Sequence, residues 1–325
     1  MNVVQGAVQA VVAAGGDAAA RLMERLEIHL LEAASGHGPL LGRHAGDTIA
    51  AGGKRLRPLL LFLAAGAPPP ESETLLRSAV AVELVHSATL VHDDVLDGSP
   101  MRRGRPTVMA AGGRLAATAT GDLLFSRAFA ELAHTRSAEA VRVLSRASSE
   151  LATGELMQRA DAWRAMSTER YLERCRLKTA VLFRAACELG ALEGDDLDRV
   201  AGLGTFGERI GLAFQLLDDV LDVTGPPERT GKPRGADLLD GTITLPFILA
   251  RERDPELGAV DLRSVVTTEQ AAEVCARIAE TGALEVTRAR ALDLVAGAKA
   301  ELPEMPERQR SALELIADGV VERYS

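Results

Sequence analysis

The sequence predicts an all-α protein, and two observations support this fold class. Apolar residues make up 47% of the 325 residues but aromatic residues only 3%, so the core must be built mainly from Ala, Leu and Val. Such side chains suit closely packed helices better than strands, which favour aromatic and β-branched residues. In addition, apolar residues recur at helical spacing along most of the chain, and no segment shows a clear strand pattern.

Two stretches illustrate the helical spacing. Near the start of the chain, Leu22, Leu26 and Leu30 are four residues apart and share one helix face. A later helix shows the same pattern at Leu75, Ala79, Val82 and Val85. The segment Val3–Gly16 is also apolar, but it is too short to span a bilayer and no basic residue precedes it. We therefore expect neither secretion nor membrane insertion.

Clusters of Gly and Pro divide the chain into separate helices. They lie at residues 36–39, 65–70, 98–106, 111–113, 225–233 and 303–306. None of these clusters is long or polar enough to be an interdomain linker. We therefore predict a single domain over residues 1–325.

The charge and cysteine content exclude several classes of protein. A net charge of −9 argues against a nucleic-acid-binding protein, because such proteins present a basic surface to phosphates. Cys175, Cys187 and Cys275 are too few and too far apart for a disulfide framework or a zinc motif, and we expect them to pack in the core. A reducing, cytoplasmic location fits this cysteine usage best.

A short internal repeat carries the main functional signal. The motif Asp-Asp-Val-Leu-Asp occurs twice, each time at the end of an apolar helical run and before a loop that contains glycine. The first copy provides Asp93, Asp94 and Asp97, and the second provides Asp218, Asp219 and Asp222. Within each copy, a helix brings the three carboxylates to one face within a single turn.

Clustered carboxylates near a helix C-terminus repel one another and the negative end of the helix dipole. A cation should therefore offset them. Oxygen ligands without His or Cys suit a hard ion, and Mg²⁺ held by a few carboxylates is usually completed by substrate phosphates. The alternative is a solvated acidic helix end. It would explain one copy well but explains two identical copies poorly.

Basic residues occur in two clusters that could bind an anion. In Gly52-Gly53-Lys54-Arg55-Leu56-Arg57-Pro58, the proline fits the first turn of a helix, so Lys54 and Arg57 flank a helix N-terminus that favours anions. The second cluster, Arg102-Arg103-Gly104-Arg105-Pro106-Thr107, follows the first aspartate motif after one turn and can reach phosphates recruited there. Taken alone, either cluster could be a solvated basic loop.

These motifs, in this order from about Gly52 to Pro246, resemble the polyprenyl diphosphate synthase family. The resemblance implies an all-α, single-domain helical bundle of the isoprenoid synthase type with a central substrate cavity. It implies a Mg²⁺-dependent enzyme that condenses an allylic diphosphate (dimethylallyl, geranyl, farnesyl or geranylgeranyl) with isopentenyl diphosphate to give a longer all-trans product. It also implies a homodimer, no nucleic-acid partner and at most peripheral membrane contact.

The resemblance assigns roles to individual residues. The two aspartate motifs would face each other across the cavity and hold the metal ions, and the catalytic set would be Asp93, Asp94, Asp97, Asp218, Asp219 and Lys178. The allylic diphosphate would be bound by Arg102, Lys178, Thr179, Gln215 and Lys232. The pocket for isopentenyl diphosphate would be formed by Lys54, Arg57, His86 and Arg103.

The sequence departs from the family pattern at one position. Many members have a lysine two residues before the Thr-Leu-Pro segment, whereas this chain has Thr242 there. This difference puts part of the expected grip on the allylic diphosphate in doubt.

Product length is predicted from the residues before the first aspartate motif. In related enzymes a bulky aromatic residue there stops growth at shorter chains, but this chain has the modest side chains of Val85, Ala88 and Thr89. We expect the product tail to pass between helices as far as Phe125 and Phe129, which share a face of the next helix, and to exceed C20.

Three other functions are weighed against this one. A short-chain synthase making C15 to C20 products would need a floor to the pocket that the sequence does not reveal. A class I terpene cyclase would not need the basic set for a second diphosphate. A non-catalytic subunit of a heteromeric prenyl synthase would be expected to have lost metal ligands, whereas both aspartate motifs are intact.

Overall fold

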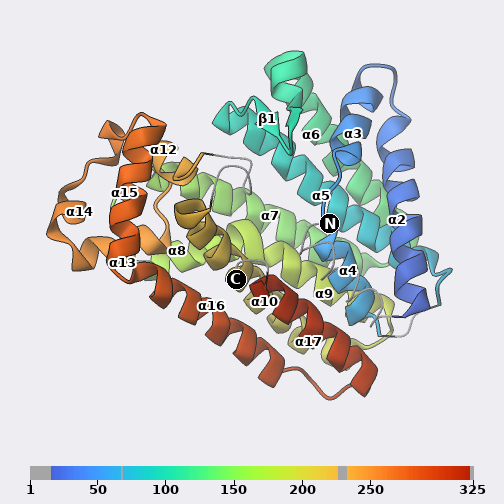
Figure 1. Cartoon of the computed structure of the whole chain (residues 1–325). Helices are drawn as coiled ribbons and strands as arrows, with labels where there is room; N and C mark the ends of the chain where they lie inside the picture. Colours follow the sequence, from blue (N-terminus) through green and yellow to red (C-terminus); the bar gives the residue numbers. More distant parts are fainter. Residues whose placement is uncertain (1–15, 67–68, 226–232, 323–325) are drawn as a thin grey trace. The chain divides into compact units, whose positions relative to one another are not determined.

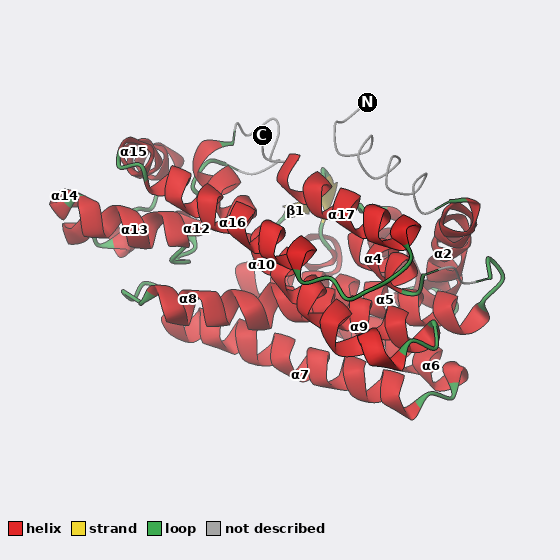
Figure 2. Cartoon of the chain, turned by 90° about the horizontal axis from the view of Figure 1, so that it is seen from below, coloured by secondary structure: helices red, strands yellow, loops and turns green. Residues whose placement is uncertain are grey.

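The computed structural model describes residues 16–66, 69–225 and 233–322, and most of these residues are helical (Figures 1 and 2). The predicted all-α fold is confirmed. Lys232 and nearly all of the apolar segment Val3–Gly16 lie outside the described residues. The described part also contains one short antiparallel hairpin, β1 (Met101–Arg102) and β2 (Arg105–Pro106), which the sequence pattern did not predict.

The chain divides into two compact units. The first comprises Met1–Ser148, Leu182–Gly207 and Glu301–Gly319, and the second comprises Ser149–Val181, Glu208–Ala300 and Val320–Ser325. The first aspartate motif and both basic clusters belong to the first unit, and the second aspartate motif belongs to the second unit. The expectation of one domain over the whole chain stays a prediction.

The helices of the first unit include α2 (Asp17–Ser35), α3 (Leu41–Ala50), α4 (Leu56–Ala64), α5 (Glu73–Asp97) and α6 (Val108–Thr135). The second unit holds α8 (Thr168–Cys175), a π-helix (Arg176–Ala180), α12 (Ala236–Leu239), α13 (Leu245–Arg253), α14 (Pro255–Ala259), α15 (Thr268–Glu280) and α16 (Ala283–Ala300). Short 3-10 turns occur at Leu197–Arg199 and Leu262–Ser264. Four helices contribute residues to both units: α7 (Ala138–Asp161), α9 (Val181–Glu193), α10 (Val200–Thr224) and α17 (Glu307–Glu322).

Helix α5 forms the core of the first unit, where it packs against α6, α4 and α2 (Figure 1). The residues that the sequence predicted to form apolar faces are completely buried. They include Leu22 and Leu26 of α2, and Leu75 and Val82 of α5. By length and composition α5 could cross a membrane, but 72% of its most apolar window is buried inside the protein. Its apolar character is that of a core helix.

Local signals set the ends of α5 and α6. Ser72 caps the start of α5 by accepting a hydrogen bond from the Leu75 amide, and Gly98 ends it with a left-handed φ of 62°. Thr107 caps α6 in the same way as Ser72 caps α5. The break predicted at residues 111–113 is confirmed, because Gly113 has a non-helical backbone, with φ 78° and ψ 174°, and α6 consists of two helical segments joined at this kink.

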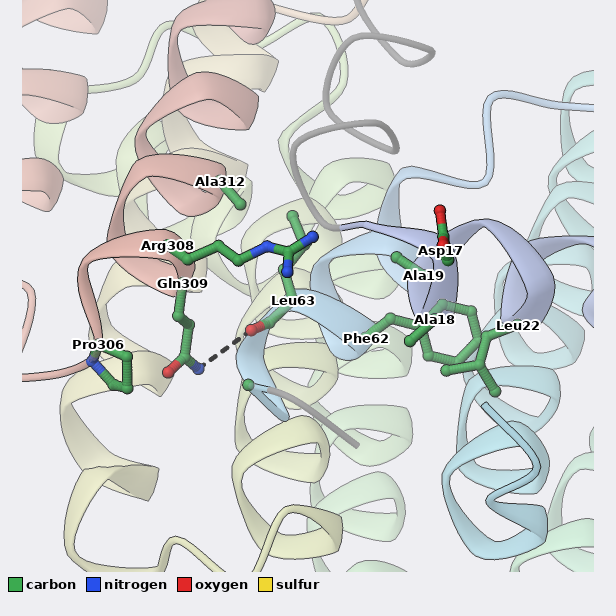
Figure 3. Close-up of a pocket in the computed structure, with 11 residues that line it drawn as sticks. Asp17, Ala18, Ala19, Leu22, Phe62, Leu63, Pro306, Arg308, Gln309 and Ala312 are labelled. Atoms are coloured by element: carbon green, nitrogen blue, oxygen red, sulfur yellow. Dashed lines mark hydrogen bonds between the residues drawn. The ribbon is translucent and has the colours of Figure 1, made fainter. Parts of the chain in front are cut away.

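The C-terminal end of α4 is capped by a side chain from α17. Gln309 is buried, and its Nε2 donates a 3.0 Å hydrogen bond to the carbonyl oxygen of Leu63 (Figure 3) and another of 3.0 Å to that of Ala64. Carbonyls in the last turn of a helix lack intrahelical donors, and here the side chain acts together with the Gly66 amide, which donates to Leu63 at 3.1 Å. Beside this cap lies a pocket of about 440 Å³ between α2, α4 and α17, whose lining includes Phe62 and Arg308.

Helix α9 approaches α4 closely at Gly190. A Cβ atom at this position would lie 2.2 Å from the Leu61 carbonyl oxygen and 2.8 Å from the Ala64 Cβ. We therefore expect Gly190→Ala to lower the free energy of unfolding by about 1–3 kcal/mol, since backbone must move to admit the methyl group.

A matched control is Gly46→Ala in α3, where the added methyl group would meet only the Ser35 hydroxyl at 3.4 Å. There the substitution should leave stability unchanged or raise it by up to about 1 kcal/mol, because Ala is the better helix former. Urea unfolding of both variants measures the difference. Equal effects of the two substitutions would contradict the close packing of α9 on α4.

Candidate active site

The loop before α4 places its cations as the sequence predicted. Lys54 precedes the helix, and Arg57 and Pro58 lie in its first turn. The Arg57 guanidinium group lies 4.4 Å from the centre of the Phe183 ring, a cation–π contact that orients it. Arg55, between them, is buried and has a left-handed φ of 48°, and sequence analysis assigned it no role.

The second basic cluster forms the β1–β2 hairpin. Arg103 and Gly104 occupy its two-residue turn with φ values of 52° and 73°, the positive values that a type I′ turn requires. Glycine meets this requirement without strain, and Arg103 occupies the other position at the exposed tip. The turn brings Arg102 back toward the end of α5.

In the first aspartate motif, the three carboxylates do not have equal environments. Asp94 is buried, and its Oδ1 accepts hydrogen bonds from Arg102 Nε at 2.8 Å and Nη2 at 2.7 Å. Asp93 is half-buried and Asp97 is exposed. The middle carboxylate is therefore held by a protein cation, whereas the outer two lie nearer to solvent.

The second aspartate motif shows the same division. Asp219 is buried and accepts hydrogen bonds from the Tyr171 hydroxyl at 2.5 Å and from Gln215 Nε2 at 2.7 Å, while Asp218 and Asp222 are half-buried. Burial, together with the nearby charge of Asp237, raises the pKa of Asp219 to about 7. The outer positions of this motif, like those of the first, have more contact with solvent than the middle position.

Residues assigned to the allylic diphosphate connect directly to the second motif. The Thr179 hydroxyl donates a 2.7 Å hydrogen bond to Gln215 Oε1, and Gln215 in turn holds Asp219. Lys178, the neighbour of Thr179, forms an ion pair with Glu155 of α7. The structure therefore brings Lys178, Thr179, Gln215 and the second motif together in one unit.

Lys178 and Thr179 lie in the π-helix between α8 and α9. Such widened turns are rare and often occur at functional sites. Gly154 of α7 allows this turn to come close, because a Cβ there would lie 2.6 Å from the Lys178 amide nitrogen. Sequence analysis missed Gly154, Glu155 and Tyr171, and no local pattern marks them as partners of this segment.

The loop that carries Thr242 is fixed by its backbone. The Thr242 amide donates a 2.8 Å hydrogen bond to the Asp237 carbonyl, and the Trp163 amide donates one of 2.9 Å to the Gly241 carbonyl. The indole of Trp163 packs directly on Gly241, where a Cβ would lie 2.3 Å from the ring. The Asp237 amide in turn donates to Asp222, so the loop is linked to the second motif.

The residues predicted to govern product length lie on α5 and α6. Val85 and Ala88 are completely buried, whereas Thr89 is half-buried. Phe125 and Phe129 are half-buried on α6, and the Phe125 ring stacks on His92 at 5.8 Å. Their role in product length stays a prediction.

A pocket of about 370 Å³ lies beside the first motif. Its lining combines Asp94 and the three hairpin arginines with His44, Asp47 and Thr48 of α3. Sequence analysis assigned no role to α3, because its polar residues show no motif.

The basic set disfavours a charged His86. Desolvation lowers the pKa of His86 well below its usual value, and the guanidinium groups of Arg57, Arg103, Arg55 and Arg102 lower it further. These effects favour a neutral His86, which can serve an anion by hydrogen bonding.

The cysteines do not supply a nucleophile. All three thiols are free and buried, as expected. Burial raises the pKa of Cys175 and of Cys275 to about 12, and it raises the pKa of Cys187 also. None of them forms a thiolate near neutral pH.

The donor set suits a hard divalent cation. Each motif offers carboxylate oxygens, and the half-buried or exposed outer residues leave them accessible to a metal. Within the described residues, no three acidic, His or Cys side chains gather closely enough to complete a metal site. Phosphate oxygens and water would have to supply the remaining ligands, as they usually do for Mg²⁺.

Residues 39–281 match the polyprenyl synthetase family. The heptaprenyl diphosphate synthase component 2 of Geobacillus stearothermophilus is 41% identical over 254 residues, which cover 77% of this chain and 79% of that protein. The geranylgeranyl diphosphate synthase of Methanosarcina mazei is 39% identical over 282 residues, 84% of this chain and 86% of that protein.

Among solved structures, the polyprenyl synthase of Caulobacter crescentus complexed with calcium and isoprenyl diphosphate has a TM-score of 0.89 and 37% identity, and the match covers 98% of both chains. The chain therefore belongs to the polyprenyl synthetase family of prenyltransferases, as the motifs predicted.

The neutral state of His86 leads to a prediction. Because burial and the neighbouring guanidinium groups lower the pKa of His86, the KM for isopentenyl diphosphate should show no titration of this residue between about pH 6 and pH 8, where an ordinary histidine titrates. His86→Gln keeps a neutral hydrogen-bonding group and should change this KM by less than about threefold. His86→Ala should raise it by about tenfold, the cost of losing a hydrogen bond to a charged group.

Initial rates at several pH values, with isopentenyl diphosphate varied, provide the measurement. The contradicting result is a wild-type KM for isopentenyl diphosphate that rises with pH between about pH 6 and pH 8, while the KM of His86→Gln stays constant. It would show that His86 is charged when isopentenyl diphosphate binds.

Proposed function

We propose that this chain is a Mg²⁺-dependent trans-prenyltransferase that condenses an allylic diphosphate with isopentenyl diphosphate. One observation carries the proposal. Both copies of Asp-Asp-Val-Leu-Asp have a buried middle carboxylate held by hydrogen bonds and outer carboxylates nearer to solvent. A repeated arrangement that places acids near solvent at the ends of two apolar helices favours metal binding over a solvated surface.

The outer carboxylates, Asp93 and Asp97 of the first motif and Asp218 and Asp222 of the second, would hold the metal. Bound Mg²⁺ would stabilise the negative charge that develops on the departing diphosphate. Asp94 and Asp219 would orient the motifs through their hydrogen bonds. A solved relative that contains calcium and isoprenyl diphosphate supports this pairing of a divalent cation with a diphosphate.

The basic residues would form two groups, each of which binds the diphosphate of one substrate. Lys178, Thr179 and Gln215 form one connected group and would bind the allylic diphosphate together with Arg102 and Lys232. Lys54, Arg57, Arg103 and the neutral His86 would bind isopentenyl diphosphate. Charge-assisted hydrogen bonds from these side chains would fix both substrates for attack of the double bond on the allylic carbon. No protein nucleophile is needed, in keeping with the raised pKa values of the thiols.

We further propose a product longer than C20. The small side chains at Val85, Ala88 and Thr89 support this length. Named relatives include geranylgeranyl, geranylfarnesyl, heptaprenyl and octaprenyl diphosphate synthases. The enzyme would act in the cytoplasm, as a homodimer with at most peripheral membrane contact.

A second candidate is a subunit that needs a different partner chain. Two relatives are named component 2 of a heptaprenyl diphosphate synthase, from Geobacillus stearothermophilus and Bacillus subtilis. The intact aspartate motifs would make this chain the catalytic component of such an assembly. Purified protein that is inactive alone would favour this candidate over the homodimer.

The central prediction is that condensation requires a divalent metal and both motifs. Purified protein given Mg²⁺, isopentenyl diphosphate and each allylic primer should form longer prenyl diphosphates detected by mass spectrometry, and excess chelator should abolish them.

Asp93→Asn or Asp218→Asn should each lower turnover at least about a hundredfold, since each removes a ligand that acts in the transition state. Asp293→Asn, which changes an exposed acid on α16, should have no effect. Near-normal turnover of either motif variant would contradict the mechanism.

The two diphosphate sites should be separable by mutation. Arg57→Ala should mainly raise the KM for isopentenyl diphosphate, and Lys178→Ala mainly the KM for the allylic substrate, each by about tenfold or more, because each loses a charge-assisted contact to one ligand. Kinetics with each substrate varied in turn provide the measurement. Equal changes in both KM values for either variant would overturn the assignment.

Product length should respond to the side chain at position 88. Ala88→Phe fills buried volume near the first motif and should shorten the product toward C15 or C20 while the metal requirement stays the same. Ala88→Ser, which is close to Ala in size, should leave the product unchanged. Mass spectrometry of the products decides. A wild-type product of C15, or an unchanged product in Ala88→Phe, would show that the tail does not pass Ala88.

A further inference from the structure

Glu83 of α5 is a buried carboxylate that the proposed reaction does not use. Only 2% of the residue is exposed, and its Oε1 accepts a 2.8 Å hydrogen bond from Arg55 Nη1. Its Oε2 has no hydrogen-bond partner in the described part of the chain. An unsatisfied oxygen on a buried charge is costly, because its lost hydration is not replaced by a hydrogen bond. A group maintained at this cost calls for a reason other than packing.

Arg55, the partner of Glu83, anchors the loop that carries Lys54 and Arg57. Arg55 also donates hydrogen bonds to Glu27 at 2.7 and 3.1 Å and to the Ile49 carbonyl at 3.1 Å. Its left-handed φ is uncommon for a residue with a side chain, and contacts on several sides are needed to hold it. The buried pair thus fixes the backbone from which two predicted diphosphate ligands extend.

A second arginine approaches the same point. A Cβ atom at Gly53 would lie 3.1 Å from both Arg103 Nη1 and Arg103 Nη2, and 3.3 Å from Arg55 Nη1. The guanidinium groups of Arg55 and Arg103 therefore both lie against the backbone at Gly53. Two like charges this close repel each other unless an anion is near.

Glu83 is the anion that offsets this repulsion. Desolvation and the charges of Arg55 and Arg102 lower the pKa of Arg103, and the negative charge of Glu83 acts in the opposite direction. The hydrogen bond from Arg55 holds the Glu83 carboxylate next to the Arg55 guanidinium group. Glu83 therefore attracts Arg103 at the place where both guanidinium groups lie against Gly53.

We propose that Glu83 is a positioning residue for the isopentenyl diphosphate site, where it anchors the Lys54–Arg57 loop through Arg55 and holds Arg103 beside that loop. It would touch neither substrate. This inference rests on the proposed function, because it assigns a task to Glu83 within that site.

Two substitutions separate this role from a simple contribution to stability. Glu83→Gln keeps an oxygen that can accept from Arg55 but removes the charge that offsets Arg103. Glu24→Gln is the matched control, because it removes the charge of an exposed acid on α2 and leaves both carboxylates on Arg55 in place. An exposed charge contributes little, so the control should be nearly silent.

Full-length variants are compared by kinetics with each substrate varied separately, by calorimetric titration with isopentenyl diphosphate alone, and by thermal unfolding. Glu83→Gln should weaken binding and raise the KM for isopentenyl diphosphate by about tenfold or more, with kcat and the allylic KM changed less than about threefold. Glu24→Gln should change every parameter by less than about twofold. Equal rises in both KM values, or an unchanged KM for isopentenyl diphosphate in folded Glu83→Gln, would overturn the proposal.

Gly53→Ala tests the inference if Glu83→Gln does not fold. The added methyl group would press on both guanidinium groups at this point, Arg103 at 3.1 Å and Arg55 at 3.3 Å, and so displace the pair that Glu83 holds together. It should raise the KM for isopentenyl diphosphate selectively, and a normal KM would overturn the proposal. If wild-type protein neither condenses nor binds isopentenyl diphosphate, the proposed function fails; if wild type binds it and Glu83→Gln binds it equally well, only this inference fails.

Discussion

The candidate site depends on one electrostatic constraint: like charges that cluster at the ends of apolar, buried helices must be compensated by groups of opposite charge or by hydrogen bonds. Carboxylates cluster at the C-terminal ends of α5 and α10, where the helix dipole is already negative. Cations cluster before α4 and in the neighbouring hairpin. Each cluster would be unstable without compensation, and the fold supplies part of it: Arg102 holds Asp94, Tyr171 and Gln215 hold Asp219, and Glu83 holds Arg55. The charged groups that lie nearer to solvent are the ones that we propose bind a metal and the diphosphates.

This constraint explains several local features that would otherwise look unusual. The type I′ turn at Arg103 and Gly104 returns the chain so that Arg102 reaches Asp94, eight residues earlier. The π-helix that contains Lys178 lies against Gly154, and the neighbouring Glu155 holds the Lys178 ammonium group. Positive φ values and a widened turn cost free energy, and those at Arg55, at Arg103 and in the π-helix occur where charged side chains are positioned.

Sequence patterns predicted the fold class, the apolar faces of α2 and α5, and the position of both aspartate motifs at helix ends, because these features depend on local spacing. They did not predict that the middle aspartate of each motif is buried. They also missed Glu83, Glu155 and Tyr171, whose partners lie 28, 23 and 48 residues away along the chain. Such pairings are set by helix packing, which a single sequence does not display. The break at Gly113, in contrast, was predicted from the sequence, because glycine can adopt the positive φ that interrupts a helix.

The most direct test of this account is the placement of the metal ions. Crystals of the protein with Mn²⁺ and a non-reactive allylic diphosphate would locate each ion by its anomalous scattering. The account predicts Mn²⁺ coordinated by the outer carboxylates, Asp93 and Asp97 together with Asp218 and Asp222, while Arg102 stays on Asp94 and Tyr171 on Asp219. Mn²⁺ bound to Asp94 or Asp219, with Arg102 or Tyr171 displaced, would contradict it.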